Sequence, residues 1–283
     1  MVDSPSRSSP TNVPEFSVLL PIYQGDDPRE LEVAIESILS QSHPPDEILI
    51  VQDGPLTLRL NELVQRKCSA SSVVETHAIE RNQGLGNALR VGVERCSHDV
   101  IARMDADDIS VPSRFERQLG YLQENPSVDI IGGYLEEFQS SPDDPVARRE
   151  VPTDHDAIVK RAKFRSPMNH GTVMFRREAV LRAGNYRATD PMEDYDLWVR
   201  MLLSGATFGN IPEILLKARA GEKLYERRGG WKYAKDEARL LVSFYKRGFT
   251  PLHVLIFNLL TRTPLRLFPN RLRGTIYELF ARV

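Results

Sequence analysis

Short apolar runs alternate with segments of helical period along the first part of the chain. Each run has the length of a strand, and between the runs apolar residues recur every three to four positions. Strands are predicted at 16–20, 47–51, 73–79 and from 100 onward, with helices at 31–39, 58–67 and 82–96. Four strands separated by helices predict an α/β fold with a mostly parallel, Rossmann-like sheet and right-handed crossovers, so the carboxyl ends of the strands would share one edge.

The fourth run ends in three carboxylates within four positions, Asp105, Asp107 and Asp108. Like charges this close repel one another, so a bound cation would stabilise them, and ligands of open α/β sheets bind at such strand ends. A solvated acidic turn is the other interpretation. A calcium-binding loop of the helix–loop–helix type is excluded, because Ile109 and Ser110 occupy the positions where that loop needs an oxygen ligand and a glycine. Apolar spacing then predicts a helix over 113–125.

Composition indicates a soluble globular protein with a large core. The 283 residues are 41% hydrophobic and 27% charged. Residues 1–14 are rich in Ser and Pro and predict a disordered lead-in without a secretory signal. Two cysteines imply no disulfide framework, so a cytoplasmic location is expected.

The charge is distributed unevenly along the chain. From position 246 to 283 there are seven basic residues and one acid, a charge of +6, although the whole chain carries −2. A basic, apolar tail on an acidic body suggests a negatively charged surface, such as an anionic membrane, as a partner. No nucleic-acid partner is expected.

Five motifs occur in an order that resembles the inverting family 2 glycosyltransferases with the GT-A fold. They are Pro21-Ile-Tyr23, Asp53-Gly54, Arg81-Asn82-x-Gly84, Met104 to Asp108, and Glu193-Asp194. The resemblance covers roughly 16–218 and is greatest to short bacterial enzymes that build exopolysaccharide or lipopolysaccharide. It implies a catalytic domain over 15–220, with a nucleotide-sugar half (15–110) and an acceptor half (111–220), followed by a basic loop and helical tail over 221–283.

The resemblance also implies roles for the donor side. A nucleoside diphosphate sugar would contact Pro21, Tyr23, Asp53, Arg81, Asn82 and Asp105. Asp107, with Asp105, would bind Mg²⁺ or Mn²⁺, and Asp108 would support them. Such a cation stabilises the charge that develops on the departing diphosphate. If the resemblance is set aside, Asp53 is typical of a turn and Arg81 of a solvated side chain before a helix.

In the acceptor half, the resemblance makes Asp194 the general base. Glu193 and His170 are expected near the acceptor, and Glu193 and Asp196 are the alternative bases. Acids at the start of a helix are also explained by capping alone, and an isolated histidine by a hydrogen bond at a strand start.

The last part of the chain departs from the processive members of the family. Their Gln-x-x-Arg-Trp motif is absent, and so are long membrane-spanning segments, which favours addition of a single sugar. Arg227 and Arg228, beside two glycines, predict a basic loop that closes over the diphosphate; a plain exposed loop is the alternative.

The tail has two interpretations. The apolar stretch 252–260 is too short to span a bilayer, and Pro264 and Pro269 are expected to interrupt it. Asn270 would then cap an amphipathic helix over 271–283. That helix either docks on the protein or lies at an anionic membrane surface.

The predicted function is transfer of one sugar from a nucleoside diphosphate sugar to a saccharide acceptor, lipid-linked, by a metal-dependent inverting enzyme at the inner face of the membrane. A sugar nucleotidyltransferase is the alternative enzyme, although the place of its Gly-rich basic loop is taken by a segment with one glycine and two acids. A noncatalytic carbohydrate-binding protein is the third interpretation.

Overall fold

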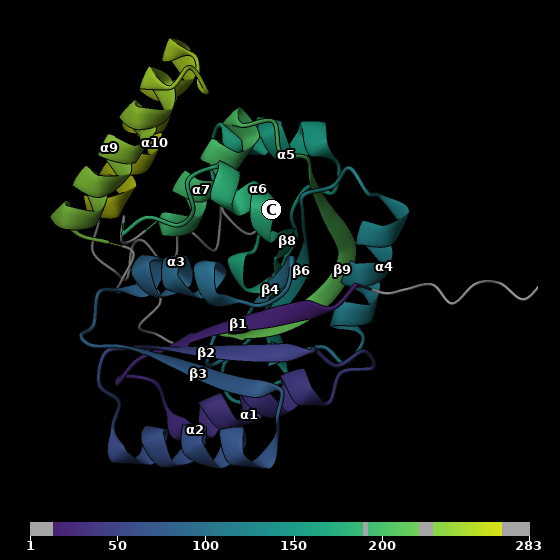
Figure 1. Ribbon diagram of the computed structural model, residues 1–283. Helices are drawn as coiled ribbons and strands as arrows, with labels where there is room; N and C mark the ends of the chain where they lie inside the picture. The colour runs from purple at the N-terminus through teal and green to yellow at the C-terminus, as the bar shows by residue number, and fades with distance from the viewer. Residues whose placement is uncertain (1–13, 189–191, 221–228, 268–283) are drawn as a thin grey trace, which may run out of the picture.

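The first half of the sheet is parallel, as the sequence predicts. The computed structural model describes residues 14–188, 192–220 and 229–267 (Figure 1). The strands of this half are β1 (Phe16–Ile22), β2 (Glu47–Asp53), β3 (Val74–Ile79) and β4 (Val100–Arg103). They lie in the order β3-β2-β1-β4, and each neighbouring pair is parallel. The helices between them are α1 (Pro28–Leu39), α2 (Leu58–Ala70) and α3 (Leu85–Arg95).

Alternation along β1 divides its side chains between two cores. Val18 and Leu20 pack with apolar side chains of α1 and α2 on one face, whereas Leu19 packs with those of α3 on the other. The entry to α1 is fixed by Asp27, whose side chain accepts hydrogen bonds from two backbone N–H groups of the first turn. Burial on both faces holds the carboxyl ends of the strands in place.

The second half of the sheet mixes strand directions. Its strands are β5 (Ile109–Ser110), β6 (Ile130–Phe138), β7 (Pro145–Arg149), β8 (Met174–Arg176) and β9 (Phe208–Arg219). β8 is antiparallel to both β4 and β6, while β9 is parallel to β6 and antiparallel to β5. The helices of this half are α4 (Arg114–Glu124), α5 (His155–Ala162), the 3-10 helix η1 (His170–Thr172), α6 (Arg177–Arg182) and α7 (Glu193–Leu203). α4 confirms the helix predicted over 113–125.

Two long helices, α9 (Trp231–Lys246) and α10 (Leu252–Leu267), form a hairpin beside the sheet (Figure 1). The expected interruption at Pro264 is wrong, because α10 continues through it. Arg262 and Arg266, on either side of the proline, both bind Glu237 of α9, which is only 1% exposed. Pro264 itself is exposed. These ion pairs hold the helix across the residue that cannot donate a backbone hydrogen bond.

The hairpin docks on the protein's own core over the residues described. Leu241 and Phe244 of α9 and Leu255 of α10 pack with Tyr195 and Val199 of α7. The predicted helix after residue 270 and the predicted lead-in up to residue 13 lie outside the described residues. In the described part of the chain, no helix combines the length and the apolar character that crossing a membrane requires.

Candidate active site

β4 delivers an arginine and three aspartates to the carboxyl edge of the sheet. Arg103, its last residue, is only 2% exposed, and its guanidinium binds both carboxylate oxygens of Asp105. A buried guanidinium is costly unless it is paired, and a two-pronged contact with a carboxylate fixes both groups. Arg103 therefore sets the orientation of Asp105.

The neighbouring acids lie where their negative charge is disfavoured. Burial, and then the charge of Asp105, raise the pKa of Asp107 to about 6 and that of Asp108 well above its ordinary range. Asp108 accepts a 2.9 Å hydrogen bond from the backbone N–H of Arg219 on β9. On the loop after β1, burial and then the charges of Asp107 and Asp105 raise the pKa of Asp26 to about 7. The sheet edge thus crowds acidic groups whose negative charge Arg103 balances only in part.

This charge fits a divalent cation that binds together with a phosphorylated ligand. Carboxylate oxygens suit Mg²⁺ and Mn²⁺, and Mg²⁺ is often held by one or two carboxylates while phosphate oxygens and water complete its shell. Among the residues that the structure describes, no three acidic, histidine or cysteine side chains are placed to hold an ion by themselves. Asp107 and Asp105 are therefore suited to supply part of a coordination shell that a ligand completes.

Asp53, at the end of β2, organises the loop before α3. Its two carboxylate oxygens each accept a 2.8 Å hydrogen bond, from the backbone N–H groups of Gln83 and Gly84. Gly54 has a φ of +85°, and a Cβ there would lie 2.5 Å from the backbone nitrogen of Asn82. Only glycine allows this close approach of the two loops. The Asp53 carboxylate thus has a structural use, and its contact with a nucleotide base stays a prediction.

The other predicted donor-side residues lie around the same edge. Tyr23 is exposed, and its backbone N–H donates a 2.8 Å hydrogen bond to the Asp26 carboxylate. Pro21 is buried in β1, whereas Arg81 and Asn82 are exposed on the loop before α3. The fold brings these residues to adjacent loops, but their ligand contacts stay predictions.

Helix α7 brings a second set of acids to the site. Glu193 and Asp194 occupy its first turn, where the helix dipole favours anions. Glu193 is buried and packs closely against α3. A Cβ on Gly86 of that helix would lie 3.2 Å from the Glu193 Cβ. Asp194 is half-buried and accepts a 3.2 Å hydrogen bond from the Ser166 hydroxyl. Of the two, Asp194 is the acid that solvent reaches more readily.

His170 lies beside α7, and the next residue, Gly171, lies beside the acids after β4. It lies on η1, not at the start of a strand, and its Nε2 is 2.9 Å from the hydroxyl oxygen of Tyr186. Its Nδ1 is 3.9 Å from a carboxylate oxygen of Glu193, and its ring packs edge-on against Trp198. Burial, and then the positive charge of Arg103, lower the pKa of His170 well below its ordinary value. The imidazole is neutral at pH 7, and its contact with an acceptor stays a prediction.

Asp196 has a structural role, so its place among the alternative bases is not supported. Its carboxylate is buried and binds Arg200 at 2.8 Å and Arg247 at 2.9 Å. Arg247 belongs to the basic tail, so this ion pair fixes the end of α9 to α7.

Three residues of the site were not recognised in the sequence. Arg103 could have been noticed as a cation inside an apolar strand that ends in acids. Asp26 has no sequence signal beyond its acidic loop. Arg219 ends a strand that the apolar pattern does not reveal; its Nε lies 3.0 Å from Glu30 and its guanidinium stacks on the Phe138 ring. Arg227 and Arg228, predicted to contact the diphosphate, lie outside the described residues.

Comparison with known proteins identifies the family. Residues 17–184 match the sequence profile described as Glycosyl transferase family 2. The amylovoran biosynthesis glycosyltransferase AmsE of Erwinia amylovora is 38% identical over 268 residues, which cover 93% of this chain and 98% of that protein. The UDP-Gal:alpha-D-GlcNAc-diphosphoundecaprenol beta-1,3-galactosyltransferase of Escherichia coli is 36% identical over 267 residues, which cover 94% of this chain and 96% of that protein.

Solved structures share the fold at low sequence identity. The mannosyltransferase PcManGT from Pyrobaculum calidifontis, in complex with GDP-Man and Mn²⁺, has a TM-score of 0.67 at 15% identity, over 96% of this chain and 77% of that one. S. aureus TarS in complex with UDP-GlcNAc has the same TM-score and identity, over 95% of this chain and 76% of that one. The sheet with its parallel half is thus the GT-A fold, and the chain belongs to glycosyl transferase family 2.

Proposed function

We propose that this glycosyltransferase moves one sugar from a nucleoside diphosphate sugar to a hydroxyl of a lipid-linked saccharide, with inversion, in bacterial cell-surface polysaccharide synthesis. The observation that carries the proposal is the meeting of two sets of acids. Nδ1 of His170 lies 3.9 Å from a carboxylate oxygen of Glu193 on α7, and a Cβ on the adjacent Gly171 would lie 3.4 Å from a carboxylate oxygen of Asp105. The donor-side acids and the helix that carries Asp194 therefore border one site.

The two sets of acids have different proposed roles, one in binding the metal and the other in accepting a proton. Asp107 and Asp105 would hold Mg²⁺ or Mn²⁺, which neutralises charge on the diphosphate when bound. Arg103 keeps Asp105 in position. Asp194 would accept the proton of the acceptor hydroxyl as that oxygen attacks the anomeric carbon from the side opposite the diphosphate. This geometry needs one positioned base and gives inversion.

Relatives narrow the choice of substrates. The E. coli relative is named for a UDP-galactose donor and a GlcNAc-diphosphoundecaprenol acceptor. We take UDP-galactose as the first donor to test and a saccharide on a polyprenyl diphosphate as the acceptor class. Such an acceptor places the reaction at the inner membrane surface. Membership of family 2 removes the support for a sugar nucleotidyltransferase.

A donor and acceptor panel tests the proposal. Nucleoside diphosphate sugars are screened by thermal shift with Mn²⁺ and with EDTA, and nucleotide release is then measured with GlcNAc-diphosphate lipids. We expect one donor to raise the melting temperature only with Mn²⁺ and to react only when acceptor is present. Equal transfer in EDTA, or a product that keeps the donor's anomeric configuration by NMR, would contradict the proposal.

A further inference from the structure

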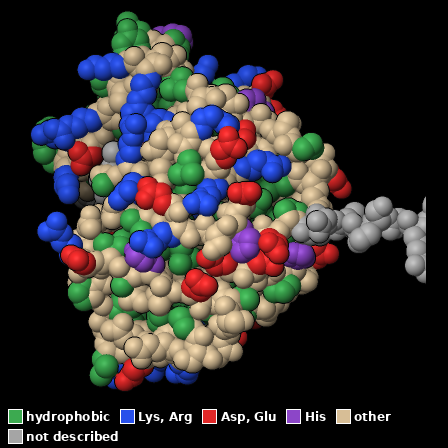
Figure 2. Space-filling view, viewed as in Figure 1, with side chains coloured by type: hydrophobic (Ala, Val, Ile, Leu, Met, Phe, Trp, Pro, Cys, Tyr) green, Lys and Arg blue, Asp and Glu red, His purple; other side chains and the backbone are tan. Residues whose placement is uncertain are grey.

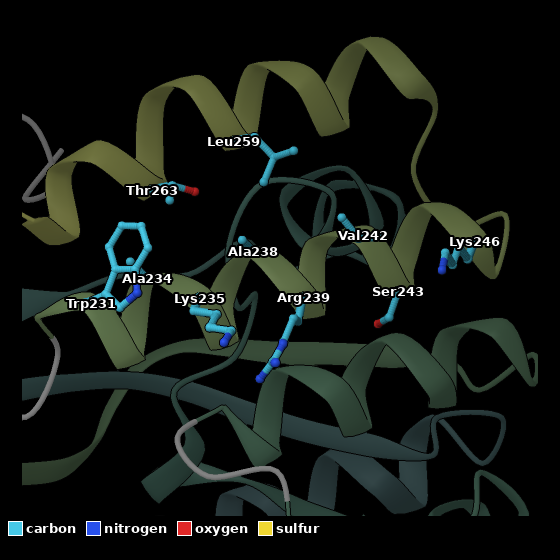
Figure 3. A pocket seen from close by; sticks show the side chains of 10 residues that line it. All are labelled: Trp231, Ala234, Lys235, Ala238, Arg239, Val242, Ser243, Lys246, Leu259 and Thr263. Atoms are coloured by element: carbon cyan, nitrogen blue, oxygen red, sulfur yellow. The ribbon is translucent and has the colours of Figure 1, made fainter.

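A groove runs between α9 and α10, away from the acids of the active site. Its volume is about 620 Å³, and Trp231 lies at one end, 72% exposed (Figure 3). The floor is apolar, formed by Ala238 and Val242 of α9 and by Leu259 of α10. The α10 side chains point toward α9 in Figure 3, so the two helices form its walls.

Next to the groove, α10 exposes large apolar side chains. Leu252, Ile256 and Leu260 recur at intervals of four residues, which places them along one side of the helix, and Leu260 is 71% exposed. Phe257 is exposed beside them. Single exposed apolar residues are ordinary, but a continuous row on one helix indicates an interaction surface.

The cations of the hairpin that do not pair with a buried acid lie on α9, and of these Arg239 forms an exposed ion pair with Asp236. Lys235, Arg239 and Lys246 line the groove, and Figure 2 shows Lys and Arg side chains gathered over this part of the molecule. Other cations of the tail are used internally. Arg262 and Arg266 bind the buried Glu237, and Arg247 binds the buried Asp196. Among the described residues of the hairpin, the cations that do not pair with a buried acid therefore lie on α9, and of the tail's described basic residues only Lys246 is one of them.

We propose that the groove, the exposed apolar row of α10 and the cations of α9, together the α9–α10 face, dock on an anionic lipid bilayer. Apolar side chains of an interfacial helix enter the boundary between headgroups and acyl chains, while Lys and Arg extend to the phosphates. Trp231 has the amphipathic ring that favours this boundary. The combination of a cationic rim and an apolar row complements an anionic membrane in both respects.

Docking would also position the active site. Tyr195 follows Asp194 on α7, and its ring packs against Phe244 of α9, with 4.9 Å between ring centroids. On its other side lies Arg262 of α10, 6.0 Å from the ring centroid. The hairpin and the helix of the proposed base are thus packed together, so a docked hairpin would hold Asp194 at a fixed height above the bilayer. This consequence rests on the proposed function, whereas the docking itself does not.

Vesicle binding of the full chain tests the docking without any sugar nucleotide. The chain has two tryptophans, and Trp198 is fully buried, so changes in tryptophan emission report on Trp231. At low salt, we expect sedimentation with phosphatidylcholine vesicles that contain phosphatidylglycerol, together with a blue shift of the emission. Pure phosphatidylcholine vesicles, or half-molar salt, should reduce binding at least tenfold.

Paired variants locate the contact. Ile256→Glu with Leu260→Glu should abolish binding, whereas Val33→Glu with Leu58→Glu, at exposed apolar positions of α1 and α2, should bind like wild type.

The charge is tested in the same way. Lys235→Ala with Arg239→Ala should lower the vesicle partition coefficient roughly ten- to thirtyfold at low salt. The control is Arg59→Ala with Arg66→Ala, which removes two exposed cations from α2. Arg66 pairs with Glu32 at the surface, as Arg239 pairs with Asp236. It should change the coefficient less than twofold.

Three outcomes would overturn the proposal. The wild-type chain could ignore anionic vesicles at low salt. Both hairpin variants could bind as well as wild type, which would place the contact elsewhere in the chain. The Ile256→Glu, Leu260→Glu variant could lower the sedimentation coefficient of vesicle-free protein, which would show that this face joins two copies. A failed donor panel would leave each of these results unchanged.

Discussion

Glu237 in the helical hairpin is a buried carboxylate and Asp107 at the sheet edge a half-buried one, and their surroundings differ. Burial would raise the pKa of Glu237, yet hydrogen bonds and charges from Arg266 and Arg262 lower it overall. At the sheet edge, burial and then the charge of Asp105 raise the pKa of Asp107. One carboxylate is balanced by two cations from its own chain, and the other is crowded by a like charge.

The difference separates stability from function. A buried acid with internal cations on both sides fixes one helix to another, and removal of the acid leaves those cations unpaired. A crowded group of acids is unfavourable in the free protein, and it persists where a ligand supplies the missing positive charge. In this protein the pKa of the carboxylate that pairs with two arginines is lowered, and that of the carboxylate crowded by other acids is raised.

The largest expected effect is on catalysis at α7. Asp194→Asn keeps the shape of the side chain and removes the base, so kcat should fall by about 10²–10⁴-fold, with donor affinity nearly unchanged. Turnover and donor titration by calorimetry check the two parts separately. Asp154→Asn, at the N-cap of α5, is the control and should leave kcat near wild type. If Asp194→Asn transfers sugar at the normal rate, Asp194 is a helix-end acid, and Glu193 becomes the next candidate.

The next effect concerns the balanced carboxylate. Glu237→Ala leaves Arg262 and Arg266 without their shared partner, so the free energy of unfolding should fall by about 3–5 kcal/mol. The adjacent Asp236 forms an exposed ion pair with Arg239, and Asp236→Ala should cost about 0–1 kcal/mol. Urea unfolding of both variants gives the comparison. Equal losses would mean that burial of Glu237 adds nothing to the hairpin.

A smaller effect is expected from pH at His170. Burial, and then the charge of Arg103, lower the pKa of His170 in the folded protein below the ordinary 6.5. As pH falls below 6.5, the unfolded chain therefore binds a proton at this residue that the folded chain does not bind. Stability should therefore drop on acidification from pH 7.5 to 5.5, by about 1.4 kcal/mol from this residue. His170→Gln should remove that part of the drop, whereas the exposed His253→Gln should not. Parallel pH profiles for wild type and His170→Gln would assign the effect to other groups.

The parallel half of the fold was predictable because β1, β2 and β4 are mostly apolar runs and each helix keeps a clear period; β3, with Glu75 and His77, is the exception. β1 to β4 and the helices between them appear where the sequence places them. The second half was less predictable. β6 contains Gly132 and Gly133, and its pairing with β9 shifts register after Gly133, so no clean alternation marks either strand.

The site was predictable as a set of motifs, but not as a network of contacts. The acids after β4 and those of α7 were recognised from local sequence. The pairing of Arg103 with Asp105 is local but depends on the conformation of the turn after β4, and the position of His170 near Glu193 depends on the packing of η1 against α7. Likewise, local rules predict a helix break at Pro264, but α10 continues through it, and Arg262 and Arg266 on either side both pair with Glu237.

The most direct test of the crowded-acid account is the stability of Asp107→Asn with and without ligand. Without metal, the variant loses one repelling charge, so its free energy of unfolding at pH 7 should be higher than that of wild type by about 1 kcal/mol. With Mn²⁺ and a nucleoside diphosphate, the melting temperature of wild type should rise, because the ligand binds the folded state, and that of the variant should rise far less. A variant that is clearly less stable without metal, and that gains as much as wild type from the ligand, would contradict the assignment of Asp107 to a cation site.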